Sequence, residues 1–301
     1  MNAAPSPDVI RTATEITDAL MPRVDASVTP IARQTETGLF QHGTGTLLTV
    51  KHRHFVVTAG HVFDVPQTYK QAIFGFAKME NGTANESRRH NPVHLRGTIH
   101  RLPDLPDVAI LEITETVRDE LIGRRFLNLG DTDLGPQLGG WAWACGYPIE
   151  SVKKDVLPLG GHNYLYNRLN LPGVIRTATA LDALKDYDPR IHFLLASDPD
   201  EMVDPNTGNL AALPEKYQGI SGTSVWQGWW PGLDSHTEWR SKKLRVVGVQ
   251  TGTYRANSLV KATAWIVVVF LLVRQFRDLW DAIDLRFPGN PDLERAKSIA
   301  R

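Results

Sequence analysis

The chain has only one cysteine and no recognisable secretory signal, and both observations bear on the cellular compartment in which it would function. Cys145 is the only cysteine among 301 residues, so no disulfide can form within the chain. Disulfides are typical of secreted proteins, and a chain without them is expected in a reducing compartment. The first twenty residues also contain no basic segment followed by an apolar one. We therefore expect a cytoplasmic protein.

The chain also lacks an excess of charge of either sign. It contains 33 Lys and Arg residues and 33 Asp and Glu residues, which gives a formal net charge of zero. Nucleic-acid-binding proteins usually have a basic surplus or a basic patch, so no nucleic-acid partner is expected. Acidic residues with the spacing of a calcium loop are missing as well, and we expect neither a metal nor a cofactor.

A third absence is that of an apolar run long enough to cross a membrane. Residues 262–273 are apolar apart from Thr263, but a membrane helix needs about 20 residues. We expect no membrane span, and interpret this run as a buried strand that leads into a packed helix. The overall 42% hydrophobic and 22% charged content is that of a globular chain and excludes disorder throughout.

Short β-rich runs separated by turn residues dominate the sequence from Val28 onward. About a dozen such runs with few helical patterns between them predict an all-β sandwich or barrel. The runs are 28–32, 44–50, 54–58, 93–100, 108–113, 141–145, 174–180, 191–195, 225–226, 244–250 and 264–269.

Helical periodicity occurs at both ends of the chain. Apolar residues recur every three or four positions in the first twenty residues, and Pro22 is expected to end that helix. A second apolar face predicts a helix at about 271–286, closed by Pro288 and Gly289. We expect a helical extension at 1–27, one β-rich domain at 28–288 and a charged tail at 289–301.

The first candidate for chemistry is Ser221, which lies between Gly219 and Gly222 just before a β-rich run. Glycine can adopt the backbone angles of a tight turn that points amide hydrogens inward. Such a turn exposes a serine hydroxyl to a reacting group. A plain surface turn would show the same residues, and this segment alone does not separate the two interpretations.

A histidine and an aspartate stand at the ends of two other β-rich runs. His61 follows a run and the small residues Ala59 and Gly60, and a structural histidine is the competing interpretation. Asp107 precedes an apolar run, where a buried carboxylate needs a strong partner such as an imidazole N–H. Weaker candidates for the base are His52 and His54, and Asp104 is the alternative acid. The order His, Asp, Ser is one in which a hydroxyl, a base and an orienting acid form a catalytic triad.

Six segments of the sequence, taken in order, resemble those of trypsin-like serine peptidases. They are 43–48 (GTGTLL), 58–61 (TAGH), 107–111 (DVAIL), 145–148 (CGYP), 219–222 (GISG) and 246–252 (VVGVQTG). The sequence departs from the family pattern at Thr223 and Ser224, which replace a Gly-Pro pair, and at Gly60, which replaces an alanine. The sequence also lacks the activation site of digestive family members, a basic residue followed by Ile-Val-Gly-Gly, at which cleavage frees a new N-terminus.

This resemblance implies two antiparallel six-stranded β-barrels, about 28–130 and about 131–270, with the active site between them. It implies that His61, Asp107 and Ser221 are catalytic. The backbone N–H groups of Gly219 and Ser221 would form the oxyanion hole. Gln250, Thr251, Gly252 and Thr253 would pair with the substrate backbone as an added strand. Glu215 lies six residues before the serine, where it could favour basic substrate side chains or simply face solvent.

The function expected from these residues is that of a serine endopeptidase acting in the cytoplasm on a protein substrate. The substrate could be a dedicated partner, or the chain could depend on an activator protein, in signalling, quality control or defence. Two alternatives remain open at this point. The chain could be a catalytically silent module that binds peptides in the same cleft, or an esterase built on the same scaffold.

Overall fold

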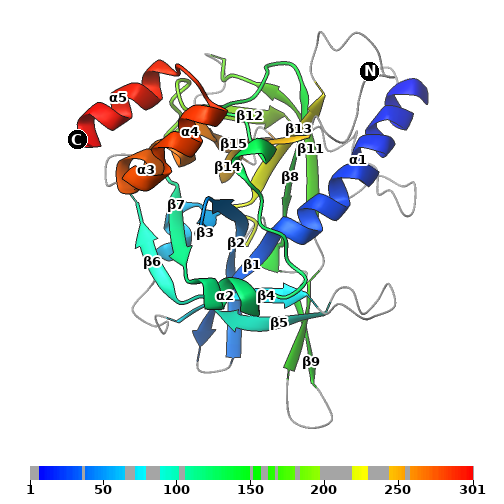
Figure 1. Ribbon diagram of the computed structural model, residues 1–301. Coiled ribbons are helices and arrows are strands. Elements are labelled where there is room, and N and C mark those ends of the chain that lie inside the picture. Colours follow the sequence, from blue (N-terminus) through cyan, green and yellow to red (C-terminus); the bar gives the residue numbers. More distant parts are fainter. Residues whose placement is uncertain are drawn as a thin grey trace.

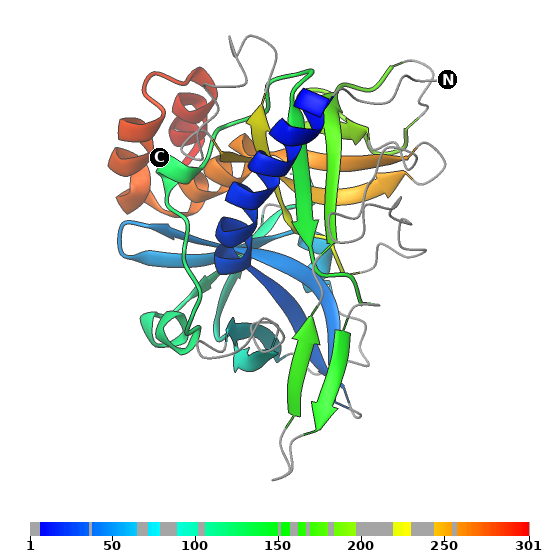
Figure 2. The ribbon, with the colours of Figure 1, turned by 90° about the vertical axis from the view of Figure 1, so that its right-hand side faces the viewer.

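Two antiparallel β-sheets form the centre of the computed structural model, and helices lie at both ends of the chain (Figures 1 and 2). The expected all-β class with a helix at each end is confirmed. The structure describes residues 7–35, 38–64, 72–78, 89–101, 106–149, 152–156, 162–166, 169–179, 184–196, 219–229, 244–254 and 258–300.

The first sheet has nine strands and forms a half-barrel. Its strand order is β6-β7-β3-β2-β1-β4-β5-β10-β9. The strands are β1 (Val28–Thr35), β2 (Gly38–Val50), β3 (Arg53–Thr58), β4 (Ile73–Lys78), β5 (Arg89–His94), β6 (Gly97–His100), β7 (Ala109–Ile113), β9 (Val152–Val156) and β10 (His162–Tyr166). A closed six-stranded barrel was expected here. The described strands do not close: the β9–β10 hairpin extends the sheet from β5, and no described pairing joins this end of the sheet to β6.

The second sheet is a closed barrel with the strand order β11-β12-β15-β14-β13-β8, as expected for this half of the chain. Its strands are β8 (Trp141–Gly146), β11 (Leu169–Arg176), β12 (His192–Ala196), β13 (Ser224–Trp229), β14 (Arg245–Tyr254) and β15 (Leu259–Ala264). Side chains alternate along each strand, so that on β15 Val260 and Ala262 fill the barrel. Lys261 and Thr263 consequently lie on its outer face.

Helix α1 (Pro7–Ser27) continues through Pro22, so the expected end of the helix at that residue is wrong. An internal proline costs about 3 kcal/mol because it lacks an N–H and crowds the preceding turn. Burial of Leu20 and Val24 on either side of it offsets that cost. Arg23 further ties the helix to the β-rich body through an ion pair with Asp131 at 2.6 Å.

The C-terminal region is more helical than expected. Strand β15 ends at Ala264 and leads directly into α3 (Ile266–Gln275), which confirms a strand followed by a packed helix. The β-rich run expected at 264–269 is wrong, because only Ala264 lies in the strand and residues 266–269 belong to α3. Two short helices follow, η8 (Arg277–Leu279) and α4 (Trp280–Arg286). The expected charged tail forms α5 (Pro291–Ala300), because Leu293 and Ala296 are buried.

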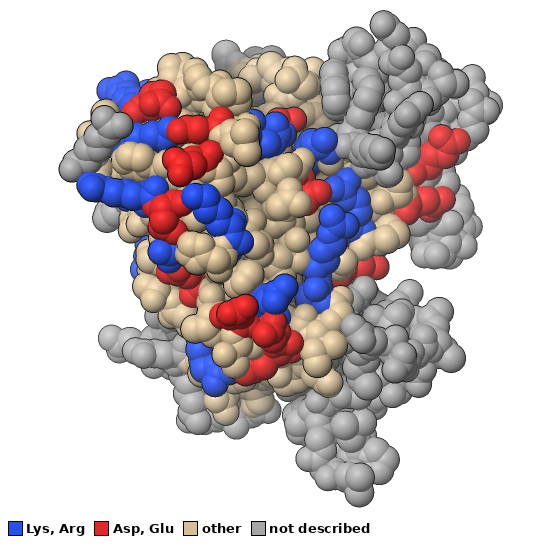
Figure 3. All heavy atoms as spheres, viewed as in Figure 1, with Lys and Arg blue, Asp and Glu red and all other residues tan. Residues whose placement is uncertain are grey.

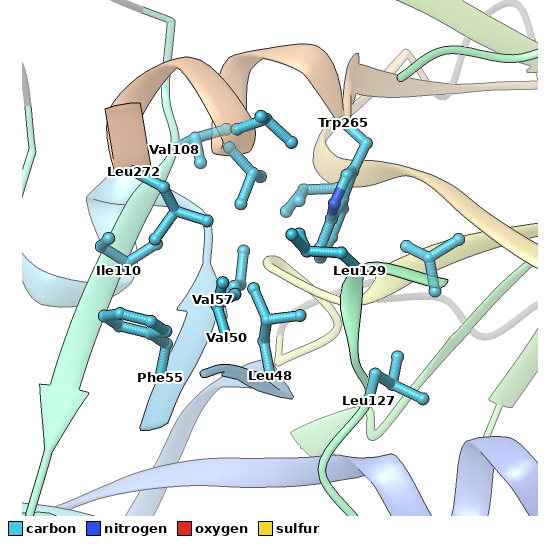
Figure 4. Close-up of a cluster of buried hydrophobic side chains, with 14 of the residues drawn as sticks. Leu48, Val50, Phe55, Val57, Val108, Ile110, Leu127, Leu129, Trp265 and Leu272 are labelled. Atoms are coloured by element: carbon cyan, nitrogen blue, oxygen red, sulfur yellow. The ribbon is translucent and has the colours of Figure 1, made fainter. Parts of the chain in front are cut away.

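The main core lies between the two sheets and α3. Figure 4 shows side chains of β2 and β3 meeting Leu272 of α3 and Trp265, with Leu127 and Leu129 at one side. On the face drawn in Figure 3, acidic and basic side chains are interspersed over the C-terminal helices. Of the helices in the described part of the chain, none is long and apolar enough to cross a membrane.

Candidate active site

His61 lies in the short helix η1 (Gly60–Phe63), which begins two residues after β3. Its neighbours Gly60, Val62 and Phe63 are buried, whereas the histidine side chain is 44% exposed. Packing of the apolar residues therefore fixes the backbone of this turn and leaves the imidazole at the surface.

Asp107 lies immediately before the buried strand β7 and is joined to His61 twice. Its Oδ2 is 2.5 Å from Nδ1 of His61, and its Oδ1 accepts a hydrogen bond of 2.7 Å from the His61 backbone N–H. Burial alone would raise the pKa of Asp107, but the hydrogen bonds and charge of His61 outweigh it and lower that pKa. An ionised carboxylate at Nδ1 favours the tautomer whose Nε2 can accept a proton.

Ser221 lies in a turn shaped by two glycines with positive φ, +92° at Gly219 and +90° at Gly222. Gly222 also approaches the other half of the molecule closely. A Cβ atom on it would lie 1.9 Å from Oγ1 of Thr58 and 2.7 Å from the backbone N of Ala59. Only glycine fits there, and the turn is thereby pressed against the segment that leads to His61.

Strand β2 of the first sheet holds the Ser221 turn by hydrogen bonds. The Thr44 N–H donates to the carbonyl of Ser221 at 2.9 Å, and the Thr44 hydroxyl donates to that of Gly219 at 2.8 Å. The Gln41 side chain donates to the same Gly219 carbonyl at 3.3 Å. The sequence did not single out Gln41 or Thr44, although both are polar residues in a glycine-rich strand.

The backbone amides expected to form the oxyanion hole, those of Gly219 and Ser221, donate to no other residue in the described part of the chain. The next amide, that of Gly222, is instead bound to the carbonyl of Gln250 at 2.8 Å. Unpaired N–H groups beside a serine can bind an oxygen that develops negative charge.

The Ser221 turn lies against Thr58 and Ala59, the residues that lead to His61. Within the described ranges, no hydrogen bond joins the Ser221 hydroxyl to the His61 ring. Catalytic hydrogen bonds are often long without substrate and tighten when it binds.

Two further residues that the sequence did not indicate hold the His61 turn. Arg33 of β1 is 2% exposed, and its guanidinium donates to the carbonyls of Phe63 at 3.2 Å and Val62 at 3.5 Å. His42 of β2 hydrogen-bonds the backbone of His61. Burial lowers the pKa of His42, and the charge of Arg33 lowers it further, which keeps this ring neutral.

Strand β14 contains the four residues expected to pair with a substrate. Gln250 and Thr251 are buried, whereas Gly252 and Thr253 are partly exposed. The ladder with β13 ends at Val249, so from Thr251 onward β14 is paired only with β15 among the described strands. Beyond the Ser221 turn, no other strand in the described part of the chain pairs with this edge of β14.

The remaining candidates lie elsewhere. His54 contacts the hydroxyl of Thr49 at 2.8 Å, and His52 lies 3.6 Å from Asp278 near the C-terminal helices. Asp104 and Glu215 are outside the described residues.

Burial raises the pKa of the Cys145 thiol, which makes it a poor nucleophile. No three His, Cys, Asp or Glu side chains in the described segments gather closely enough to hold a metal ion.

Comparison with known proteins relates the chain to solved structures only. No protein-family model matches it, and no curated protein matches it. A protease called Anisep from Arthrobacter nicotinovorans is 13% identical, over 82% of this chain and 94% of its own, with a TM-score of 0.46. The serine endoprotease from Yersinia pestis is 14% identical, over 92% and 69%, with a TM-score of 0.48.

A third structure, the thermostable serine protease AL20 from an extremophilic microorganism, is 11% identical, over 81% of this chain and 93% of its own, with a TM-score of 0.46. At such identities a likeness concerns the fold and assigns no residue a role. Support for a role of any residue of this chain therefore comes from the geometry of its own side chains.

Proposed function

We propose that the chain is a serine endopeptidase that hydrolyses peptide bonds of a protein substrate with His61, Asp107 and Ser221. The main support is the paired contact of Asp107 with the ring and the backbone of His61. The glycine turn that contains Ser221 packs against the residues leading to the same histidine.

The proposed reaction uses these residues in the following order. Nε2 of His61 takes the proton of the Ser221 hydroxyl while its oxygen attacks the carbonyl carbon of the peptide bond. The N–H groups of Gly219 and Ser221 stabilise the negative oxygen of the tetrahedral intermediate. His61 then gives its proton to the departing amine, which leaves an acyl ester on Ser221. A water molecule, deprotonated by His61, hydrolyses that ester and restores the serine.

The substrate would bind as an extended strand along β14. The edge of β14 from Thr251 to Tyr254, which pairs with no other described strand, would offer backbone N–H and C=O groups to a substrate bound at Ser221. The Gln250 side chain is 1% exposed and donates to the Gly252 carbonyl at 3.1 Å. It would therefore stabilise β14 and would not contact the substrate.

The single cysteine supports work in a reducing compartment, so we propose a cytoplasmic protease that acts on a protein partner or answers to an activator protein. A peptide-binding module without turnover is the second candidate. It is favoured by one observation, that within the described residues Ser221 and His61 are not hydrogen-bonded.

Cleavage of natural proteins separates the two functions. A lysate of the source organism is incubated with the wild-type chain or with Ser221→Ala, and new N-termini are identified by mass spectrometry. The protease produces termini that are absent with Ser221→Ala. Proteins that are captured by both forms without new termini would instead support the binding module. Turnover of small esters without new termini would support an esterase.

A further inference from the structure

Two buried polar residues of β2, Gln41 and Thr44, bind the carbonyl of Gly219 from the other sheet. Thr44 is fully buried and Gln41 is 4% exposed. The Thr44 hydroxyl donates to this carbonyl at 2.8 Å, and the Gln41 amide donates to it at 3.3 Å. Side chains that are 175 and 178 positions away in the sequence therefore hold the glycine that precedes the Ser221 segment of the turn.

The other hydrogen bonds of Thr44 and Gln41 leave each side chain one orientation. The Thr44 hydroxyl accepts from the Tyr147 N–H at 3.1 Å, so its single hydrogen is directed to Gly219. The Gln41 amide nitrogen donates to the carbonyls of Tyr147 and Gly219, and reversing the amide would place its oxygen against both. A Cβ atom on Gly219 would lie 3.0 Å from Nε2 of Gln41, so the amide lies directly against the glycine.

The two amides expected to form the oxyanion hole differ in what fixes their direction. The Ile220 carbonyl accepts from the Thr223 N–H at 3.1 Å, and the planar peptide bond places the Ser221 N–H opposite that carbonyl. The direction of the Gly219 N–H depends on the conformation of the glycine itself. Because glycine has no Cβ, rotation about its backbone bonds is restricted less than in any other residue. Gly219 therefore depends on hydrogen bonds from outside the turn.

We propose that Thr44 and Gln41 are positioning residues, which direct the Gly219 N–H toward the oxygen that becomes negative when Ser221 attacks. This inference rests on the proposed function, since it concerns the oxyanion hole of a peptidase. Without these donors, the Gly219 peptide group would rotate more freely, and its N–H would point toward the reacting oxygen for only part of the time. That oxygen gains its charge in the transition state, so the loss should lower kcat much more than it raises KM.

The first test measures kcat and KM for a peptide whose cleavage the lysate experiment identifies. Thr44→Val removes the hydroxyl but keeps the shape of the side chain, and should lower kcat about 10- to 100-fold with KM nearly unchanged. Thr44→Ser restores the hydroxyl and should restore most of kcat. Gln41→Met should lower kcat less than Thr44→Val, because the Thr44 hydroxyl still binds the carbonyl.

The matched control is Thr46→Val on the same strand. Thr46 is as deeply buried as Thr44, but its hydroxyl binds no residue in the described part of the chain. Thr46→Val should therefore keep the wild-type kcat. Urea unfolding of each variant identifies any that does not fold.

The second test reports the oxyanion hole directly and does not depend on turnover. The ketone carbon of a peptidyl trifluoromethyl ketone is attacked by the Ser221 oxygen, the hydroxyl proton passes to His61, and the ketone oxygen becomes the anion. ¹⁹F NMR distinguishes the ionised adduct from the adduct that has taken up a proton. The ratio of ionised to protonated adduct at a fixed pH should fall about 10- to 100-fold in Thr44→Val and should not change in Thr46→Val.

The outcomes separate this inference from the function on which it rests. Hydrolysis by the wild-type chain together with an unchanged adduct ratio in Thr44→Val overturns the positioning role and leaves the protease intact, whether or not kcat falls. If Thr44→Val does not fold, an adduct ratio in Gln41→Met that equals the wild-type ratio overturns it equally. If the wild-type chain and Ser221→Ala show no difference in cleavage, the proposed function and this inference are both wrong.

Discussion

The two sheets of the molecule hold their parts of the candidate site in different ways. In the half-barrel, His61 is fixed by side chains, because Asp107, Arg33 and His42 each bind it or the turn around it. In the closed barrel, two glycines with positive φ and main-chain hydrogen bonds shape the Ser221 turn, and the side chains of Thr44 and Gln41 from the other sheet bind one of its carbonyls. The position of His61 should therefore be disturbed when a single polar side chain near it is removed. The position of Ser221 should be disturbed when a single carbon atom is added to a glycine of its turn.

The largest effect is expected in the half-barrel. Asp107→Asn should lower kcat about 10⁴-fold, because an amide no longer holds the ring in the tautomer with a free Nε2. Steady-state hydrolysis of a peptide identified as a substrate measures it. Glu112→Gln removes a carboxylate from the neighbouring strand β7, where it pairs with Arg53, and should leave kcat nearly unchanged. Near-normal turnover of Asp107→Asn would remove that residue from the mechanism.

The corresponding change in the closed barrel is Gly222→Ala. The new Cβ would have to displace Thr58 and would impose a positive φ on alanine, so unfolding free energy should fall by more than about 3 kcal/mol. Gly289 also has a positive φ, +66°, but a Cβ atom on it would meet no other atom within 4 Å. Gly289→Ala should therefore cost only about 1 kcal/mol. Equal losses in the two variants, measured by urea unfolding, would show that close approach at Gly222 is unimportant.

The barrel also contains a buried histidine whose titration sharpens the contrast. An unfolded histidine binds a proton near pH 6.5, whereas burial and Lys261 lower the pKa of His192 to about 4 in the folded chain. Between these values the unfolded chain binds more protons, so stability is full above about pH 6.5 and falls as the pH is lowered toward 4. The loss should approach about 2–3 kcal/mol.

Urea unfolding at pH 7 and pH 4.5 measures this loss in two variants. In His192→Asn an amide oxygen can still accept from the Asp188 N–H, as Nδ1 of His192 does at 2.9 Å, and part of the pH dependence should vanish. His52→Gln changes an exposed histidine and should keep the wild-type dependence. The same pH dependence in all three proteins would contradict a neutral, buried His192.

The smallest effect is expected for the support of the His61 turn. Arg33→Met removes the hydrogen bonds to the carbonyls of Val62 and Phe63, and a slightly displaced base should lower kcat about tenfold. Arg124 likewise donates to two backbone carbonyls, but these belong to Asp25 in helix α1 and to Val28 at the start of β1. Arg124→Met should destabilise the chain without changing kcat. If both variants lose stability but keep the wild-type kcat, Arg33 does not position the base.

The sequence predicted those features that depend on neighbouring residues. The β-rich runs, the glycines around Ser221 and the strand that leads into α3 follow from local patterns. The helix end at Pro22 was wrong because tertiary burial of Leu20 and Val24 outweighs a local preference. The pairing of the β9–β10 hairpin with β5 was missed because it joins residues about 75 positions apart, which no local pattern marks.

The support of the site could not be predicted for a similar reason. Arg33, Gln41 and Thr44 act on residues 29 to 178 positions away, and no local pattern marks such a contact. The roles of His61, Asp107 and Ser221 in catalysis remain predictions, with a geometry that supports them.

The most direct test of the central claim is intact-protein and peptide mass spectrometry after treatment with a fluorophosphonate, which reacts with activated serine hydroxyls. We expect one adduct, located on Ser221, that is lost in Ser221→Ala and forms much more slowly in His61→Ala because the base is missing. No adduct on the wild-type chain, or an adduct on Ser221 that forms equally fast without His61, would contradict it.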